Sequence, residues 1–236
     1  MDRQQKIIEM FDTISPTYDR LNRILSLGID KGWRRRACYA ALKTYGKSAA
    51  LLLDVASGTG DLVLYWNRAS KKLNLPIDHV ICVDPSVKML EIARRKVSFA
   101  EFLVNEASAI EVADGTADLI SIGYGIRNVV EIDRAISEFF RLLKPGGVLL
   151  ILEFMQREKQ SFVDKLMRIY ISKVLPSIGR AISKDERAYT YLPESIAAFL
   201  TKEALVEKLQ NAGFEIVEAR DETFAISTSF IARKPQ

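Results

Sequence analysis

The sequence predicts an α/β fold in which a largely parallel sheet is covered by helices on both faces. The first observation is that short apolar runs alternate through the centre of the chain with segments of helical spacing, about 10–15 residues long. The second is that acidic residues and glycines follow the first two apolar runs, where open α/β sheets bind ligands. The third is size, since 236 residues with 48% hydrophobic side chains can bury the core of one domain.

The first four strands are expected at residues 50–55, 80–83, 99–104 and 117–122. Between them, residues 61–73 have helical spacing, and Ser86 is a suitable N-cap for a helix that runs to about Val97. A further helix is expected over residues 131–143. Helices in these connections imply right-handed crossovers and a sheet that is buried on both faces.

The C-terminal part of the chain continues this sheet. The segment "KPGG" at residues 144–147 is expected to be a turn that leads into a strand over 148–154. A helix over 202–211 is expected to end near Gly213. Two more strands are expected at 215–220 and 224–233, as candidates for an antiparallel pair at the sheet edge.

Two helical segments do not belong to the alternating pattern. One precedes the first strand and the other follows the fifth, and both place apolar side chains at helical spacing. The chain is therefore expected to form a single domain over residues 1–236. Its parts are an N-terminal helical cap, a core, a helical insertion, and a C-terminal helix with edge strands, over residues 1–48, 49–158, 159–199 and 200–236.

The composition and charge narrow the class of protein. Residues 1–48 hold ten Lys/Arg and five Asp/Glu, while the whole chain has a formal charge of +4. This basic segment fits nucleic acid, lipid headgroups or a charged substrate, or else a solvated helix face. Cys38 and Cys82 form no disulfide framework or zinc spacing, so a reducing cytoplasm and no metal site are expected. The first residues have no apolar h-region before a small-residue cleavage site, so secretion is not expected, and no apolar run approaches the roughly 20 residues of a membrane-spanning helix.

The segment "DVASGTGDL" after the first strand indicates a ligand-binding loop. Gly58 and Gly60 allow a tight turn and a close approach of backbone to ligand, although a plain strand-to-helix turn would also explain them. Val63 stands where a dinucleotide fingerprint has its third glycine. Asp54 places a carboxylate near the loop, which disfavours a pyrophosphate and favours a cationic ligand. An NAD-dependent oxidoreductase is therefore not favoured.

Asp84, at the end of the second strand, extends this interpretation. Its carboxylate can accept hydrogen bonds from both hydroxyls of a ribose, although an Asp before Pro85 is also typical of a turn. A ligand with a ribose, an adenine and a positive centre but no phosphates is S-adenosylmethionine. The sequence therefore predicts this cofactor.

The motifs "LDVASGTGDL", "DPSVKML" and "LKPGGVLLILEF" resemble those of class I S-adenosylmethionine-dependent methyltransferases. More specifically, the chain resembles the C-methyltransferases of menaquinone and ubiquinone biosynthesis. The segments that carry this likeness are "FDTISPTYDRLNRILSLGIDKGWRR", "GIRNV" and "LPSIG…YTYLPESI". They lie outside the shared cofactor fold and together span most of the chain.

The resemblance implies a Rossmann-like, seven-stranded sheet with the last strand antiparallel. It also implies transfer of a methyl group to a ring carbon of a polyprenylated quinol. The cofactor contacts that it implies fall on Thr59, Asp84, Glu106, Ala107 and Gly123. The family usually has serine where Gly123 stands, so this chain offers only backbone there.

The segment "GYGIRN" after the fourth strand has the groups that such a reaction needs. A quinol becomes a good carbon nucleophile when it loses a phenolic proton, and a guanidinium beside the oxygen stabilises the phenolate. Arg127 is expected in this role, Asn128 is expected to orient a hydroxyl or carbonyl, and Tyr124 is expected to shape a slot for the ring. The alternatives are an ion pair of Arg127 with Glu131, and core packing of Tyr124.

No strong base is evident for the phenolic proton. A water held by Arg127, or Asp19 with Tyr18 in the N-terminal segment, is the candidate acceptor. Tyr189 and Tyr191 are candidates for lining the ring or its tail. The one histidine, His79, opens the second strand, away from the strand ends, and is expected to be a surface residue.

A polyprenylated substrate lies in a bilayer, so transient contact with a membrane surface is expected. The candidate segments are the N-terminal helices, with Arg20, Arg23, Lys31 and Arg34–Arg36, and a basic helix near 159–178. We expect a cytoplasmic protein that binds peripherally to the inner face of the cytoplasmic membrane. A homodimer is a candidate oligomeric state.

The substrate has two candidates within the family. Demethylmenaquinol, a naphthoquinol, is favoured over a 2-methoxy-6-polyprenyl-benzoquinol of ubiquinone biosynthesis. An RNA methyltransferase would explain the pI of about 9.0, but no Asn/Asp-Pro-Pro-aromatic motif follows the fourth strand and no aromatic-basic platform is visible. A nucleic-acid-binding module without activity leaves the glycine loop unexplained, so nucleic acid is not an expected partner.

Overall fold

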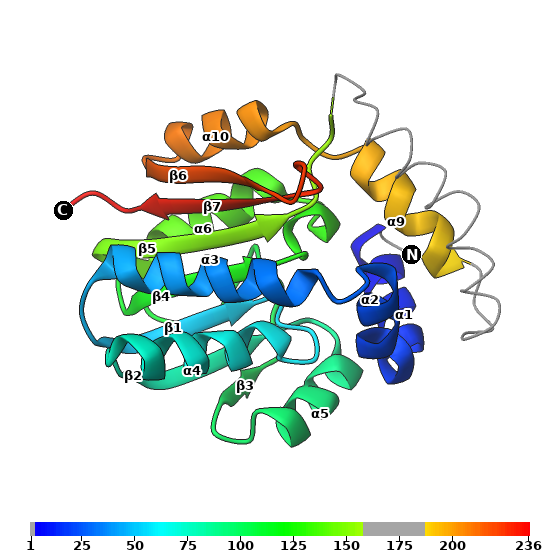
Figure 1. Cartoon of the computed structure of the whole chain (residues 1–236), viewed down its shortest axis with the longest axis horizontal. Coiled ribbons are helices and arrows are strands. Elements are labelled where there is room, and N and C mark those ends of the chain that lie inside the picture. Colours follow the sequence, from blue (N-terminus) through cyan, green and yellow to red (C-terminus); the bar gives the residue numbers. More distant parts are fainter. Residues whose placement is uncertain (1–2, 158–186) are drawn as a thin grey trace.

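The computed structural model describes residues 3–157 and 187–236 (Figure 1). Seven strands form one sheet in the order β3-β2-β1-β4-β5-β7-β6. The strands are β1 Ala49–Val55, β2 Ile77–Val83, β3 Glu101–Leu103, β4 Ala117–Gly123, β5 Leu143–Glu153, β6 Glu215–Glu222 and β7 Ser227–Arg233. The α-helices are α1 Arg3–Ile14, α2 Tyr18–Leu25, α3 Asp30–Tyr45, α4 Asp61–Leu73, α5 Val87–Lys96, α6 Ile132–Leu142, α9 Arg187–Ala197 and α10 Lys202–Asn211.

The topology confirms the predicted α/β class. Strands β3, β2, β1, β4 and β5 pair in parallel, whereas β7 is antiparallel to both β5 and β6. This is the mostly parallel, seven-stranded sheet with the last strand antiparallel that was expected. The carboxyl ends of β1, β2 and β4 therefore meet at one edge, where a ligand site is expected.

Two hydrophobic clusters fill the space between the sheet and its helices. One contains Trp33, Cys38 and Leu42 of α3 and lies with α4 against one face of the sheet. The other contains Phe139 of α6 and Leu209 of α10 and covers the opposite face. Because both faces are covered, the central strands are buried over nearly their whole length, as a parallel sheet requires.

Most predicted helices and strands are confirmed, and some of their ends differ from the predicted ones. The helices over 61–73 and 202–211 have the predicted bounds, and Ser86 Oγ accepts the Met89 N–H as the expected N-cap of α5. Strand β2 begins three residues earlier than expected and β3 is shorter at both ends.

The prediction of a plain turn at "KPGG" is wrong. Residues 144–147 belong to β5, which is irregular there because the register with β4 shifts between Ala117 and Leu119. The Gly146 N–H donates to the carbonyl of Lys234 at 2.9 Å, and the Lys234 N–H donates to that of Gly147 at 3.0 Å. The segment is held on the sheet by residues that follow β7, a long-range pairing that local turn signals do not reveal.

Strand β7 begins later than predicted. Three successive residues, Thr223, Phe224 and Ala225, have φ of 35°, 54° and 58°. Left-handed backbone cannot continue a strand, so the β6–β7 connection occupies the start of the predicted strand.

Helices α1, α2 and α9 lie beyond the carboxyl ends of the parallel strands, whereas α3, the last helix of the predicted N-terminal cap, covers a face of the sheet (Figure 1). A short 3₁₀ turn, η1 Ser15–Thr17, joins α1 to α2. Residues 158–186 of the predicted insertion lie outside the described residues. None of the helices in the described ranges is both long and apolar enough to cross a membrane.

Candidate active site

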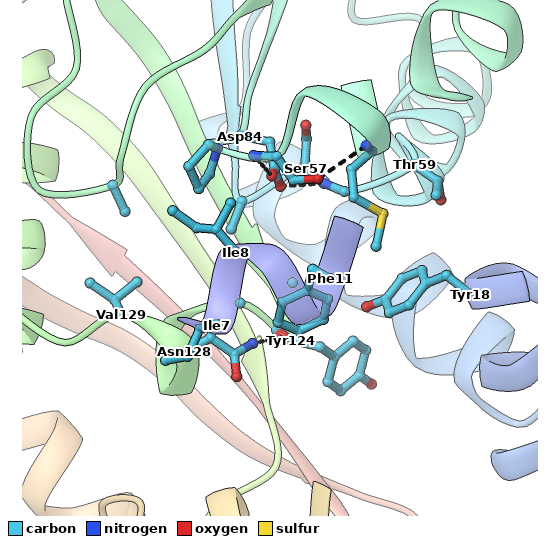
Figure 2. Close-up of a pocket in the computed structure, with 18 of the residues that line it drawn as sticks. Ile7, Ile8, Phe11, Tyr18, Ser57, Thr59, Asp84, Tyr124, Asn128 and Val129 are labelled. Carbon is cyan, nitrogen blue, oxygen red and sulfur yellow. Dashed lines mark hydrogen bonds between the residues drawn. The ribbon is translucent and has the colours of Figure 1, made fainter. Parts of the chain in front are cut away.

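A cavity opens at the carboxyl ends of β1, β2 and β4, beneath α1 (Figure 2). The space between its lining residues is about 870 Å³, a volume that includes open solvent at the mouth. The wall on the sheet side is formed by residues that follow the strands: Ala56, Ser57, Gly58, Thr59, Asp84, Pro85, Glu106, Ala107, Gly123, Tyr124, Gly125 and Asn128. The opposing wall is formed by residues of α1 and α2, among them Gln4, Ile7, Ile8, Phe11 and Tyr18, and Arg34 of α3 reaches the cavity beside Gly123 and Tyr124.

The loop after β1 has the geometry that the glycines predict. Ala56, Gly58 and Gly60 have positive φ of 48°, 55° and 78°, so the chain turns tightly before α4 begins at Asp61. A Cβ on Gly60 would lie 2.8 Å from Val97 Cγ2, a distance that real side chains do not tolerate. Gly58 lines the cavity, and nothing lies within 4 Å of the place where its Cβ would stand except Tyr18 Cε1 at 4.0 Å. A ligand can therefore approach this backbone closely.

Asp84 lies where the prediction places it, at the cavity wall after β2. Its Oδ2 accepts the Gly58 N–H at 2.8 Å and its Oδ1 accepts the Ser86 N–H at 2.9 Å. Burial raises the pKa of Asp84 to about 6, while these two backbone hydrogen bonds oppose that rise. Each oxygen still has a free lone pair, so the carboxylate can accept two further hydrogen bonds from a ligand.

Ser57 lies at the same wall, but its hydroxyl faces the protein interior. Its Oγ is buried and makes no regular hydrogen bond among the described residues. Its side chain acts on the buried Cys82 thiol, where it opposes the rise in pKa that burial causes.

Asp54 does not line the cavity, although it was predicted as a cofactor contact. It points below the loop, where Ser121 Oγ donates to its Oδ1 at 2.5 Å and its Oδ2 has no partner in the described structure. Burial raises its pKa to about 7. Asp54 can therefore influence the cavity only through the electrostatic effect of its charge.

Thr59 and Asp19 meet at the entrance to the loop. Thr59 Oγ1 donates to Asp19 Oδ1 at 2.6 Å, and Lys96 Nζ lies 2.7 Å from Asp19 Oδ2. Thr59 lines the cavity but Asp19 does not. The carboxylate of Asp19 therefore ties α2 to the loop, and it is not placed to receive a proton from a ligand.

Glu106, Ala107 and Gly123 all line the cavity, as predicted. A Cβ on Gly123 would lie 3.1 Å from Leu62 Cδ2 and 3.7 Å from Arg34 Nη1. A side chain at position 123 would therefore crowd both neighbours, which explains why a glycine serves here.

Tyr124 and Asn128 reach the cavity from the "GYGIRN" segment (Figure 2). The Tyr124 ring is buried, with its centroid 4.6 Å from that of Phe154, and its φ is 60°. Asn128 Nδ2 donates to the Tyr124 carbonyl at 3.3 Å, and Asn128 Oδ1 accepts the Tyr191 hydroxyl at 2.8 Å. Both side chains are thereby held in fixed positions at the wall.

Arg127 points away from the cavity and does not line it. Its Nη1 lies 2.5 Å from Glu153 Oε1 and also donates to the Tyr124 carbonyl at 3.1 Å. Its Nε donates to Ser195 Oγ at 3.3 Å. The guanidinium thus forms a buried ion pair, and its partner is Glu153 and not Glu131. Its visible effect is to anchor the segment that carries Tyr124 and Asn128.

Other predicted residues are placed more simply. Tyr18 lines the cavity, and burial raises the pKa of its phenol. The T-shaped packing of Phe11 against Tyr18 joins α1 to α2. His79 is exposed, as expected, and the side chain of Tyr189 lies outside the described residues.

Sequence reasoning missed Arg34 and the apolar face of α1 as parts of this site. Arg34 was grouped with the surface cations, but it is 6% exposed. The available signal is spacing, because Asp30, Arg34, Cys38 and Leu42 follow at four-residue intervals on the buried side of α3. An arginine on the apolar side of a helix is a candidate for a buried site.

The chain is similar to known methyltransferases over nearly its whole length. A model of the ubiE/COQ5 methyltransferase family matches residues 1–234. The chain is 44% identical to the ubiquinone/menaquinone biosynthesis C-methyltransferase UbiE of Campylobacter jejuni, covering 99% of this chain and 100% of that protein. It is 40% identical to the demethylmenaquinone methyltransferase of Chlorobaculum tepidum, covering 98% and 93%.

The fold is shared more widely. A crystal structure of a SAM-dependent methyltransferase from Aquifex aeolicus superimposes with a TM-score of 0.57 at 20% identity, covering 99% of each chain. This likeness concerns the fold alone. The family match, by contrast, extends through the cap, the loop and the "GYGIRN" segment that build the cavity, so the chain belongs to the ubiE/COQ5 methyltransferase family and is a methyltransferase.

Proposed function

We propose that the cavity binds S-adenosylmethionine and a polyprenylated quinol, and that the enzyme methylates a ring carbon of the quinol. The observation that carries the proposal is the contrast between its two walls. The sheet-side wall has the polar groups of Asp84 and the Gly58 backbone, whereas the α1 wall presents Ile7, Ile8 and Phe11. A polar nucleoside and a flat apolar ring can be held face to face between such walls.

The cofactor half fits its ligand by chemistry. The free lone pairs of Asp84 suit two ribose hydroxyls. Thr59, Gly60, Glu106, Ala107 and Gly123 complete this wall or its turn. Bound S-adenosylmethionine supplies a methyl group on a positively charged sulfur.

The acceptor half is proposed from its lining and from the relatives. Names of similar proteins specify menaquinone or ubiquinone biosynthesis, and demethylmenaquinone in several cases. We therefore take demethylmenaquinol as the substrate, in preference to the methoxy-benzoquinol of ubiquinone biosynthesis. Tyr124 and Asn128 position the ring, because their own contacts with Phe154 and Tyr191 hold them at the wall.

Holding the ring in line can supply several kcal/mol of the barrier, up to about 7–11 in ideal cases. Tyr18 also reaches the cavity, and its hydroxyl is the protein group that we propose to receive a hydrogen bond from the quinol oxygen. A water bound at the wall completes proton release from the phenol. Arg127 acts indirectly, by fixing the position of the Tyr124–Asn128 segment.

Membrane contact is proposed through the α2–α3 connection. Of the basic residues predicted for this role, Arg23, Arg34 and Arg36 are taken up in ion pairs with acids of this chain. Arg20, Lys31 and Arg35 are exposed, and they flank Leu27 and Ile29, which are 74% and 42% exposed. This combination suits reversible binding to an anionic bilayer that carries the substrate.

The test uses purified protein, S-adenosylmethionine with a deuterated methyl group, and each of the two quinols in detergent micelles. Mass spectrometry should show one labelled methyl group on the ring of demethylmenaquinol. Labelling of the benzoquinol at a higher kcat/KM would contradict the substrate preference. Labelling of neither quinol, with cofactor bound, would contradict the proposed reaction.

A further inference from the structure

Arg34 is a buried cation whose end nitrogens have no acceptor among the described residues. It is 6% exposed on α3, and its Nε donates to Asp30 Oδ2 at 3.2 Å. Within residues 3–157 and 187–236, neither Nη1 nor Nη2 donates a hydrogen bond to the protein. The guanidinium carbon lies 4.9 Å from the centroid of the Tyr124 ring, and Arg34 lines the cavity.

This arrangement leaves donors available to a ligand. A guanidinium has five N–H donors, and the end nitrogens of Arg34 are not among the fully buried atoms without a partner, so they face the cavity. Arg127, the neighbouring buried arginine, differs, since its donors reach Glu153, Ser195 and the Tyr124 carbonyl. Arg34 is also the one cation among the described residues of the cavity wall. Its free donors therefore indicate an anionic group of a ligand.

The order of the strands indicates which end of a ligand reaches Arg34. Glu106 and Ala107 follow β3, Asp84 follows β2, the glycine loop follows β1, and Gly123 is the last residue of β4. The sheet order β3-β2-β1-β4 places these groups in one row. The distance from β2 to β4 is two strand spacings, roughly 10 Å. An extended adenine–ribose–amino acid ligand, with its ribose at Asp84, brings its amino acid end to β4.

Gly123 leaves that end open. The position where its Cβ would stand is 3.7 Å from Arg34 Nη1, so a side chain would occupy the space beside the guanidinium. The glycine keeps this space clear, next to the strand end that the amino acid part would reach.

We propose that Arg34 binds the carboxylate of the methionine part of S-adenosylmethionine. This inference rests on the proposed cofactor and adds a residue to its site. A carboxylate is the natural partner of a guanidinium, because its two oxygens match the planar fork of donors. The methionine carboxylate is also the single anionic group of a ligand that otherwise carries an amine and a sulfonium. Arg34 would thus hold the cofactor at the end opposite Asp84.

The experiment compares two ligands that differ at the carboxylate. One is S-adenosylhomocysteine, and the other is 5′-deoxy-5′-(3-aminopropylthio)adenosine, which keeps the amine and lacks the carboxylate. Each is titrated by calorimetry into the wild-type protein and into Arg34→Met and Arg34→Lys. Arg35→Met is the matched control, because Arg35 is the next residue on α3 and is exposed.

The wild-type protein should prefer S-adenosylhomocysteine over the truncated ligand by about 10- to 100-fold, the range of one charged hydrogen-bonded pair. Arg34→Met should abolish most of this preference, with little change for the truncated ligand. Arg34→Lys should keep part of it, since lysine has the charge without the fork. Arg35→Met should bind both ligands as the wild type does.

Other results would overturn the inference. Equal losses for both ligands would mean that Arg34 only maintains the shape of the site. Unchanged binding of both ligands together with slower quinol methylation would place the guanidinium at the acceptor oxygen instead. If Arg34→Met does not fold, the wild-type preference and its reduction in Arg34→Lys decide the question. Absence of S-adenosylhomocysteine binding by the wild type would contradict the proposed cofactor itself, whereas binding without quinol methylation contradicts only the proposed acceptor.

Discussion

Replacing Arg127 with methionine should destabilise the fold by about 3 kcal/mol. The side chains of Arg127 and Glu153 are 7% and 0% exposed, so removing the arginine leaves a carboxylate buried without its partner. Breaking such a pair typically costs 3–5 kcal/mol. The Phe154 N–H still donates to Glu153 Oε1 at 2.8 Å, which places the expected loss at the lower end of this range. Urea unfolding of the cofactor-free protein measures the change.

The loss should also depend on pH. Burial already raises the pKa of Glu153, and Arg127 opposes that rise. Without Arg127 the folded-state pKa moves further above the unfolded value of about 4.5. A carboxyl whose folded pKa is raised lowers stability as pH rises between the two values, so Arg127→Met should be least stable at pH 8 and recover towards pH 5. Arg127→Met combined with Glu153→Gln removes the charge and should regain much of the loss at pH 8.

One result would refute this reasoning. If Arg127→Met unfolds at the same urea concentration as the wild type at pH 8, yet methylates the quinol 10²- to 10³-fold more slowly, then Arg127 acts on the developing phenolate. A loss of that size is typical of one preorganised electrostatic group. The guanidinium would then have to leave Glu153 when substrate binds.

Three further predictions concern residues at and beneath the sheet-side wall of the cavity. Asp84→Ala should weaken S-adenosylhomocysteine binding by about 2–3 kcal/mol in calorimetry, whereas Asp78→Ala, on the exposed start of β2, should not. Asp54→Asn should raise the free energy of unfolding by a few kcal/mol at pH 8 and by little at pH 4. The reason is that the folded-state pKa of about 7 makes the wild type lose stability as the pH rises from about 4 to 7. Equal gains at both pH values would contradict this. Gly125→Ala should cost about 1–3 kcal/mol in urea unfolding, since its Cβ would lie 2.6 Å from that of Ala56, and a neutral result would mean that the loop shifts freely.

The parts of the fold that the sequence predicts well are those with local signals. The helix over 61–73 follows a glycine turn and ends at Asn74, which has φ of 54°, so both ends are marked in the sequence. The "KPGG" segment has equally strong turn residues, but its conformation depends on β4 and on Lys234, far away in the chain. Long-range pairing overrides the local preference there.

The residues of the candidate site also differ in how well the sequence predicts them. Gly58 and Asp84 were predictable because both follow apolar runs that end at the same sheet edge. Arg34 and Arg127 were assigned to the wrong surroundings, because both arginines resemble exposed or catalytic cations in the sequence. Their roles depend on which buried acid each one meets, Asp30 for one and Glu153 for the other. No spacing in the sequence connects Arg127 to a residue on β5.

The cap and the cofactor loop are joined by one chain of charges, and this has a functional consequence. Asp61, at the start of α4, pairs with Arg23 of α2 and with Lys96 of α5, and Lys96 also pairs with Asp19 beside the loop. Arg23 in turn pairs with Asp30, the partner of Arg34. These partly buried pairs are screened by salt less than exposed ones. Helices α2 and α3, which carry Tyr18 and Arg34, are therefore attached to α4 and α5 on either side of the loop, so ordering the loop also favours the position of these two helices.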